Sequence, residues 1–337
     1  MSRECILVTG GAGYIGSHVC KSLSRAGWRP VVYDNLSRGN EWAVRWGDLV
    51  RGDLADRALL EKTLDLYRPI AVVHLAALAY VGESVECPDL YYRNNVGGTL
   101  TLLEVCKNAG ISRIVFSSSC ATYGIPDRLP IAEDMPQVPV NPYGASKLMA
   151  ERILKDFGGA YGLKSIVLRY FNACGADPEG EIGESHCPET HLVPRALMAA
   201  AGALPHVDIF GEDYETPDGT AIRDYVHVTD VAQGHTAALR RLIEGQAFGA
   251  YNLGAGRGYS VRDVLRKVEE VTGRKLSVNR TVRRAGDPPV LIADNRLALH
   301  ELGFEPRHST LDEIVATAWR WLERSKSLSR NRDGEKV

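Results

Sequence analysis

The segment VTGGAGYIGSH spans residues 8–18 and lies between a short apolar run, Cys5–Thr9, and a longer helical pattern, Ile15–Ala26. Its glycines at positions 10, 13 and 16 are spaced as in a turn that joins a strand to a helix. Glycine permits a tight turn and close approach of the backbone to a pyrophosphate, while the helix N-terminus offers oriented N–H groups to that anion. A glycine triplet alone is weak, but the strand–turn–helix setting predicts a dinucleotide-binding loop.

Acidic residues follow the next two expected strands. Asp34 comes directly after the apolar run Pro30–Tyr33, 18 residues beyond Gly16. A carboxylate near that spacing binds the adenosine ribose hydroxyls and repels a 2′-phosphate, so the sequence favours NAD over NADP. A turn or helix-capping aspartate is the alternative, and the adjacent Asn35 leaves it open. Asp53 is a candidate for the adenine edge or a plain turn residue.

Short apolar runs alternate with helical patterns over residues 1–175, which predicts a parallel sheet covered by helices on both faces. The expected strands are Cys5–Thr9, Pro30–Tyr33, Ile70–Leu75, Ile114–Ser117 and Ser165–Arg169. The expected helices are Ile15–Ala26, Ala58–Leu66, Leu90–Ala109 and Tyr143–Phe157. The predicted fold class is therefore α/β, with a doubly wound, mostly parallel Rossmann sheet.

A smaller α/β lobe is expected for residues 176–325, where it would supply the substrate pocket, with part of 221–250 returning to the first domain. It begins after an irregular segment, Ala173–His191, rich in Gly, Pro and acidic residues. Residues 326–337 form a polar tail that we expect to be frayed. The expected elements of the lobe are a strand at Val207–Phe210 and helices near Val193–Ala201, Val231–Ile243, Val261–Thr272 and Leu311–Leu322.

Composition narrows the class of protein. The formal net charge of −2 over 337 residues gives no electrostatic footprint for nucleic acid or an anionic membrane. The seven cysteines are scattered without paired metal-site spacing, so we expect reduced thiols in the cytoplasm and no bound metal. The N-terminal apolar run is too short for a signal peptide or a membrane span.

Three residues form a candidate catalytic group. Tyr143 and Lys147 stand four residues apart on an expected helix, so their side chains share one face. A tyrosine with a pKa of about 10 is a poor base at neutral pH, but a neighbouring ammonium stabilises its phenolate. Ser119, at the end of an expected strand, would share the hydroxyl proton of a bound alcohol. The helix pair alone is weak, but with the glycine loop it predicts hydride-transfer chemistry.

With these residues in place, the chain resembles the UDP-glucose 4-epimerases (UDP-galactose 4-epimerases) of the extended short-chain dehydrogenase/reductase family. The resemblance runs in order from about residue 5 to 322. Besides the glycine loop, Ser117-Ser118-Ser119 and Tyr143-x-x-x-Lys147, it rests on Val81–Val85, Tyr92–Val96, Leu168–Asn172, Asp218–Thr220, Arg223–Val228, Tyr251–Gly254 and Arg283–Asp287.

The resemblance implies an isomerase that interconverts UDP-glucose and UDP-galactose by reversible hydride transfer through a 4-keto sugar. Tyr143 would be the base for the 4-hydroxyl, Ser119 would assist, and Lys147 would lower the tyrosine pKa and bind the nicotinamide ribose. NAD would remain bound, and the protein would form a homodimer through the helices near Leu90–Ala109 and Tyr143–Phe157.

The resemblance also implies two sets of binding residues. The NAD set is Gly10, Gly13, Tyr14, Ile15, Gly16, Asp34, Asn35, Asp53, Leu54, Leu75, Ala76, Ala77, Asn95, Tyr143, Lys147 and Phe171. The UDP-sugar set is Ser119, Tyr143, Asn172, His191, Leu192, Asp208, Phe210, Arg223, Arg284, Asp287 and Leu291.

Several alternatives stay open. Arg223 and Arg284 can clamp a diphosphate through bidentate bonds or can pair with Asp224 and Asp287. A UDP-xylose/UDP-arabinose 4-epimerase shares these motifs, and Leu291 leaves acceptance of N-acetylated sugars undecided. A non-catalytic NAD-binding regulatory protein is disfavoured by the intact catalytic group. Dehydratase chemistry needs an extra acid and base, which Ser119-Cys120-Ala121 lacks.

Overall fold

The computed structural model describes residues 3–284 and 286–334, with side chains as far as residue 325. Its main element is a seven-stranded sheet in the order β10-β6-β5-β4-β1-β2-β3, and every neighbouring pair is parallel. The order reverses on either side of β1, as in a doubly wound dinucleotide-binding fold, so the predicted fold class is confirmed. The strands are β1 (Cys5–Thr9), β2 (Arg29–Asp34), β3 (Asp48–Arg51), β4 (Ala71–His74), β5 (Arg113–Ser119), β6 (Lys164–Tyr170) and β10 (Phe248–Leu253).

Apolar side chains on both faces of the sheet explain why it is buried. Along β1, Ile6 and Val8 pack in one core cluster and Leu7 in the other, because successive side chains of a strand point to opposite faces. The first cluster includes residues of α1 (Tyr14–Arg25) and α8 (Val228–Ile243). The second includes residues of α2 (Arg57–Tyr67), α5 (Gly98–Asn108) and α6 (Pro142–Tyr161).

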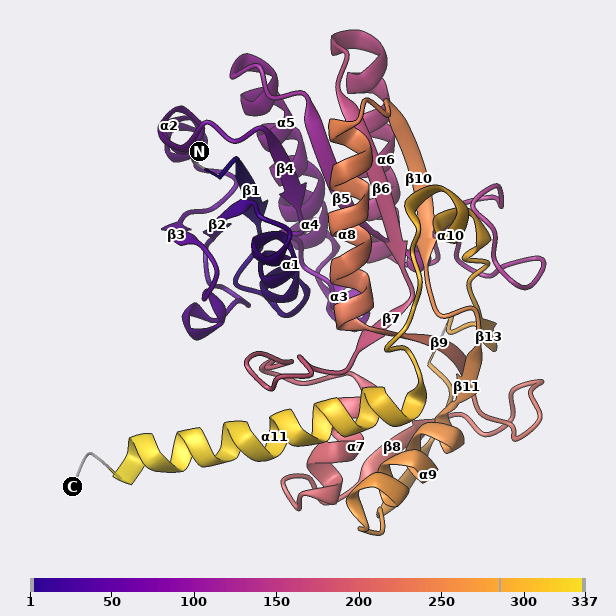
Figure 1. Ribbon diagram of the computed structural model, residues 1–337. Coiled ribbons are helices and arrows are strands. Elements are labelled where there is room, and N and C mark those ends of the chain that lie inside the picture. Colours follow the sequence, from indigo (N-terminus) through magenta and orange to yellow (C-terminus); the bar gives the residue numbers. More distant parts are fainter. Residues whose placement is uncertain (1–2, 285, 335–337) are drawn as a thin grey trace.

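The second lobe lies below the large sheet in Figure 1. It holds a small sheet in which β9 pairs with β7, β11 and β13, and a separate two-stranded sheet of β8 and β12. A third apolar cluster packs these strands against helices. The elements are β7 (Asn172–Cys174), β8 (Val207–Phe210), β9 (Ile222–His227), β11 (Gly258–Ser260), β12 (Val278–Thr281), β13 (Val290–Leu291), α7 (Leu192–Ala200), α9 (Val261–Thr272) and α11 (Leu311–Gly334). The short helix α10 (Arg296–Leu302) instead packs in the first cluster, beside β10 and α8.

Two elements differ from the sequence-based expectation. The single helix predicted for Leu90–Ala109 is α4 (Pro88–Tyr91), a π-helical turn at Tyr92–Gly97 and then α5, preceded by the short α3 (Val81–Glu86). Helix α11 continues to Gly334, so residues 326–334 are helical where a frayed tail was expected. None of the helices within residues 3–284 and 286–334 is long and apolar enough to span a membrane.

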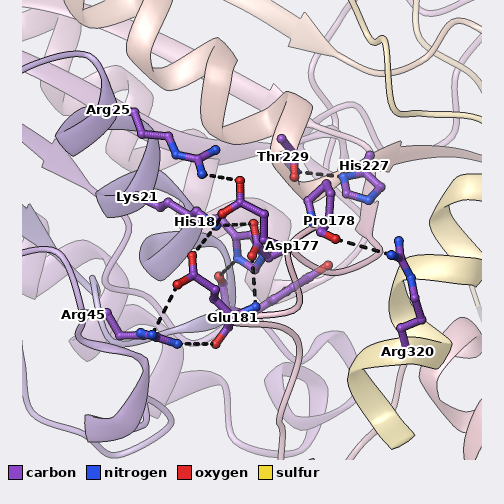
Figure 2. Close-up of polar contacts among 12 residues, drawn as sticks. His18, Lys21, Arg25, Arg45, Asp177, Pro178, Glu181, His227, Thr229 and Arg320 are labelled. Carbon is purple, nitrogen blue, oxygen red and sulfur yellow. Dashed lines mark hydrogen bonds and ion pairs between the residues drawn. The ribbon is translucent and has the colours of Figure 1, made fainter. Parts of the chain in front are cut away.

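The irregular segment that leads into the second lobe is fastened to α1 by charge. The Lys21 amine lies 2.7 Å from a carboxylate oxygen of Asp177, 2.9 Å from one of Glu179 and 2.7 Å from one of Glu181. Arg45 adds an ion pair of 3.3 Å to Glu181. Figure 2 shows Lys21 of α1 and Arg45 directed toward Asp177 and Glu181 of the segment. The two lobes are thus joined directly beside the glycine loop.

Candidate active site

The glycine loop lies between β1 and α1, and its geometry excludes larger residues. Gly10 has a φ of +73°, and a Cβ on Gly16 would lie 2.1 Å from the Gly10 carbonyl oxygen. Gly13 is the N-cap of α1, whose first turn carries no acidic side chain. The N–H groups of a first helical turn lack partners within the helix, and their positive end favours an anion. This donor set fits the pyrophosphate of a dinucleotide.

Asp34 lies at the carboxyl end of β2 beside this loop. Its carboxylate accepts hydrogen bonds from the backbone N–H groups of Ala12 at 3.0 Å and Leu36 at 2.8 Å. Burial raises the pKa of Asp34, and the two donors partly offset that rise. The neighbouring Asn35 donates to the Asp53 carboxylate at 2.7 Å. The structure therefore brings Asp34, Asn35 and Asp53, the candidates for binding the adenosine end of NAD, close together. Asp34 also makes the backbone contacts of a turn aspartate, which was the alternative interpretation.

The loop after β4 closes against the glycine loop. A Cβ on Gly10 would lie 2.6 Å from the backbone nitrogen of Ala76. Asn95 holds the next part of this loop, because its amide accepts from the Leu78 N–H at 2.9 Å and donates to the Leu78 carbonyl oxygen and the Ser146 hydroxyl, both at 3.0 Å. Asn95 belongs to the π-helical turn, a feature frequent at functional sites. It is therefore a positioning residue that links the loop to α6.

The candidate catalytic group assembles where β5 ends and α6 begins. Asn141 caps α6 by accepting from the Gly144 N–H at 2.8 Å, which sets the start of the helix. Burial raises the pKa of Tyr143 to about 12, while a hydrogen bond with the Ser119 side chain acts to lower it. The Lys147 amine lies 6.0 Å from the centroid of the Tyr143 ring. The three predicted residues are thus neighbours.

Burial is the largest influence on the pKa of both Tyr143 and Lys147. Burial lowers the pKa of Lys147 to about 7, and Glu151 opposes this only in part. Both reactive side chains are therefore held toward their neutral forms, because burial disfavours the charged form of each. Generating a phenolate at Tyr143 requires additional positive charge or a proton acceptor beside it.

A buried ion pair beneath α6 was not predicted. Arg169 of β6 forms two hydrogen bonds to the Glu151 carboxylate, at 2.7 and 3.1 Å, and both side chains are less than a tenth exposed. Ser118 also donates to Glu151, and Arg169 donates to the Tyr123 hydroxyl at 2.7 Å. The pair fixes α6 to β5 and β6. An arginine within an otherwise apolar strand, Ile166–Tyr170, was the available sequence signal.

The candidate substrate residues occupy the second lobe and its junction. Arg223 forms an ion pair with Asp287, whereas Asp224 accepts from backbone N–H groups, so only one of the two alternative partners is used. The Arg284 guanidinium stacks 3.8 Å above the Phe210 ring. The charge of Arg223 lowers the otherwise raised pKa of the Cys120 thiol, which places this arginine near the residue after Ser119.

The remaining candidate binding residues differ in their surroundings: some pack in an apolar cluster, some are exposed, and one is held by polar contacts. Leu291 packs with the NAD candidate Phe171 and with Tyr123 in a small apolar cluster. Asp208 is held by Arg195 at 3.1 Å and by Asn279 at 2.9 Å. Asn172 starts β7 with an exposed side chain, and Leu192 is the first residue of α7.

His191, a candidate substrate contact, has two carboxylate partners in the protein. Its Nδ1 atom lies 2.9 Å from the Glu184 carboxylate and 2.8 Å from the Glu189 carboxylate. Burial alone would lower the pKa of His191, but hydrogen bonds to these two carboxylates outweigh it and raise the pKa to about 10. The same two carboxylates raise the pKa of His186 to about 9. Sequence reasoning missed Glu184, His186 and Glu189, whose spacing to His191 was the available signal.

The parallel sheet, the glycine loop at its first turn and the Ser119–Tyr143–Lys147 group define a dinucleotide-dependent enzyme with a buried tyrosine base. The comparison with known proteins then identifies the family. The NAD dependent epimerase/dehydratase family matches residues 6–254, and the chain belongs to it.

The relatives agree over nearly their whole lengths. The UDP-glucose 4-epimerase of Rhizobium meliloti (strain 1021) is 50% identical over 324 residues, 96% of this chain and 98% of that protein. A crystal structure of UDP-glucose 4-epimerase from Brucella ovis in complex with NAD is 56% identical, with a TM-score of 0.92 over 94% of this chain and 97% of the other. The enzyme from Stenotrophomonas maltophila, with bound NAD and formylated UDP-arabinopyranose, is 38% identical, with a TM-score of 0.93 over 97% and 100% of the two chains.

Proposed function

We propose that this protein is an NAD-dependent enzyme that interconverts UDP-glucose and UDP-galactose through a 4-keto sugar. The observation that carries the proposal is that Ser119, Tyr143 and Lys147 are neighbours, on a fold that is closely similar to that of UDP-glucose 4-epimerases. Bound NAD⁺ would supply the hydride acceptor for carbon 4 of the sugar and the donor that returns the hydride. The reaction is redox-neutral overall.

Side chains of the protein would carry out the proton transfer. Tyr143 takes the proton of the sugar 4-hydroxyl and returns it, with Ser119 sharing the hydrogen bond during transfer. The Lys147 amine is anchored to the Ser117 carbonyl oxygen at 2.8 Å and lies where it can bind the nicotinamide ribose. The glycine loop with Asp34, Asn35 and Asp53 would hold the pyrophosphate and adenosine.

The second lobe would bind the nucleotide part of the substrate firmly and the sugar part loosely. Arg223 and Arg284 lie on different segments, and each carries a charge suited to a diphosphate. A clamp on the nucleotide leaves the hexose free to turn, so that the hydride can return to its other face. We therefore retain residues 1–175 as the NAD-binding domain and 176–325 as the sugar-nucleotide lobe, with α8, β10 and α10 returning to the former.

One experiment separates the candidate activities. Purified protein without added NAD is incubated with UDP-galactose or UDP-arabinose, and the epimer formed is quantified by chromatography. Faster turnover of UDP-galactose supports the hexose enzyme, whereas preference for UDP-arabinose supports the pentose enzyme. No turnover of either, with NAD still bound to the protein, would leave the non-catalytic NAD-binding protein.

A homodimer is the assembly that fits the surface. Exposed apolar side chains gather on helices α3, α4, α5 and α6, namely Val81, Val85, Leu90, Leu100 and Met149. Burying them against a second copy would remove them from water. Light scattering should give twice the chain mass of 36.9 kDa, and Met149→Asp should shift it toward the monomer. Leu66→Asp, at an exposed leucine of α2, should leave the assembly unchanged.

We also assign the protein to the cytoplasm. All seven cysteines are free thiols, four of them buried in the cores of the lobes. Free thiols persist in a reducing compartment. An N-terminally unmodified protein recovered from the soluble fraction of disrupted cells would support the assignment, and recovery outside the cell would contradict it.

A further inference from the structure

Four side chains of one short segment converge on a single point. Glu184, His186, Glu189 and His191 each direct one oxygen or nitrogen to it, and the four atoms all lie within 4.8 Å of one another. The Nδ1 atom of His191 is 2.9 Å from Glu184 and 2.8 Å from Glu189. The Nδ1 atom of His186 is 3.0 Å from Glu184 and 3.6 Å from Glu189. Both imidazoles therefore face the same pair of carboxylates.

In the metal-free protein, the protons on the two imidazoles balance the charge of the two carboxylates in this cluster. The side chains of Glu184 and Glu189 are only 9% and 8% exposed. Within residues 3–284 and 286–325, the ion-pair partners of these two carboxylates are His186 and His191. Two carboxylates removed from water need matching positive charge. A divalent cation carries the same charge as the two imidazole protons and would take their place among the four donor atoms.

A second acidic group in the same segment already has a buried lysine as its cation. Asp177, Glu179 and Glu181 also lie within 4.8 Å of one another, but the Lys21 amine already sits among them at 2.7 to 2.9 Å. Figure 2 shows this lysine together with Arg25 and Arg45 around the group. A cation bound there would have to displace a buried ammonium. The two acidic groups of the same segment are thus chemically distinct.

The donor chemistry selects a class of cation. Two imidazole nitrogens and two carboxylate oxygens suit zinc and similar first-row divalent ions rather than calcium or magnesium, which prefer oxygen ligands alone. Zinc bonds of about 2.0–2.2 Å place tetrahedral ligand atoms about 3.4 Å apart. The observed separations are close to that value before any adjustment. We infer that Glu184, His186, Glu189 and His191 form a structural zinc-class site.

The surroundings hold the ligands in place. Glu189 accepts hydrogen bonds from the backbone N–H groups of Thr190 and His191, both at 2.8 Å, which orients its carboxylate. The ring of Tyr80 lies 6.0 Å from that of His186, and the ring of Tyr14 lies 6.1 Å from it. With four protein ligands the site is closed, which is typical of structural rather than catalytic zinc.

The position of the cluster gives a cation bound there a structural role. His191 is the N-cap of α7, and the next residue, Leu192, is a candidate substrate contact. Tyr14 belongs to the glycine loop and donates to the Gly175 carbonyl oxygen at 2.6 Å. A bound cation would therefore fix the start of α7 relative to the dinucleotide loop. No metal was predicted from the scattered cysteines, although the spacing Glu-x-His-x-x-Glu-x-His of residues 184–191 is a signal for one.

The test measures metal rather than catalysis. The full-length protein is stripped with a chelator, exchanged into buffer, and titrated with Zn²⁺ in competition with a chromophoric chelator. We expect about one tightly held zinc per chain and a rise in the thermal unfolding midpoint, since a ligand that binds the folded state stabilises it. Co²⁺ in its place should give the intense visible absorption of a tetrahedral site.

Matched variants assign the ion to the cluster. His186→Ala and Glu184→Gln should weaken zinc binding by more than the ~10–100-fold that changes around a ligand cause. Glu179→Gln, in the lysine-bound acidic group, should bind zinc as the unaltered protein does. Retained NAD shows that each variant is folded. The proposal is overturned if the stripped protein takes up no stoichiometric zinc, if His186→Ala binds it equally well, or if Glu179→Gln abolishes binding.

Discussion

The Lys147 amine donates a 2.8 Å hydrogen bond to the carbonyl oxygen of Ser117, on the strand that ends at Ser119. This bond joins α6 to β5 and so fixes the position of Tyr143 relative to the serine hydroxyl. The amine is buried, with 3% of the residue exposed, and burial lowers its pKa to about 7. The site therefore places a desolvated lysine where an ammonium will be required, and this costs stability.

The first prediction follows from that cost. Because the pKa of Lys147 is lower in the folded protein than the ordinary 10.5, the unfolded chain binds more protons between about pH 7 and pH 10.5. Stability of the NAD-free protein should therefore rise with pH across this window, by up to about 1.4 kcal/mol per pH unit from this group. Lys147→Met should remove that part of the slope, measured by urea unfolding.

Lys155→Met is the control for this measurement, because Lys155 lies two turns further along the same helix with an exposed side chain. It should leave the slope unchanged. Equal slopes in Lys147→Met and the unaltered protein would show that the lysine keeps its proton in the folded state.

The second prediction concerns the tyrosine hydroxyl. Tyr143→Phe removes the group that exchanges a proton with the sugar and leaves the ring in place. Turnover of UDP-galactose should fall by roughly 10²–10⁴-fold, the usual scale of general acid–base catalysis. Bound NAD, measured after denaturing the protein, should be unchanged. Tyr161→Phe, at the exposed end of the same helix, should keep full activity. Full activity in Tyr143→Phe would remove this residue from the chemistry.

Much of the fold was predictable because the pattern is local. Alternation between the two core clusters along Ile6, Leu7 and Val8 is a property of a single strand, and glycine at position 16 is required by the adjacent turn. The break in the expected helix at Leu90–Ala109 was not predictable in this way. The π-helical turn depends on Asn95 reaching Leu78 and Ser146, which are distant in sequence.

The residues of the candidate catalytic group were predictable from the sequence, but the contacts that each residue makes were less so. Ser119, Tyr143 and Lys147 were expected together, and they lie together. Burial raises the pKa of Tyr143, which a sequence does not report, and the lowering of this pKa by Lys147 beside bound NAD remains a prediction. The binding roles of the individual residues remain predictions, because contacts such as that between Arg223 and Asp287 are set by tertiary structure and change when a ligand competes for the arginine.

The third prediction tests the glycine loop. Gly16→Ala places a methyl group 2.1 Å from the Gly10 carbonyl oxygen, a backbone atom that cannot move aside without distorting the loop. We expect loss of bound NAD and a lower unfolding midpoint. Gly159→Ala in α6 is the matched control, because its Cβ would meet no atom within 4 Å. That variant should be neutral or more stable by up to about 1 kcal/mol. NAD retained at full occupancy in Gly16→Ala would contradict the packing argument.

The last prediction concerns acid. His235 is fully buried on α8, with its Nε2 atom 2.6 Å from the Tyr170 hydroxyl and its Nδ1 atom 2.9 Å from the Val231 carbonyl oxygen. Burial lowers the pKa of His235 to about 4, below the ordinary 6.5. Between about pH 4 and pH 6.5, the unfolded chain therefore binds a proton at His235 that the folded chain does not bind. This stability is fully present above pH 6.5 and is lost as the pH falls toward 4.

His235→Gln keeps a polar group beside Tyr170 but cannot titrate. The fall in unfolding free energy between about pH 6.5 and pH 4 should become shallower by about 1.4 kcal/mol per pH unit, the value for one proton. His300→Gln, at an exposed position on α10, should follow the unaltered protein. Unfolding by urea at several pH values measures both. An unchanged slope in His235→Gln would mean that this histidine is protonated within the folded core, which its two short hydrogen bonds would then have to accommodate.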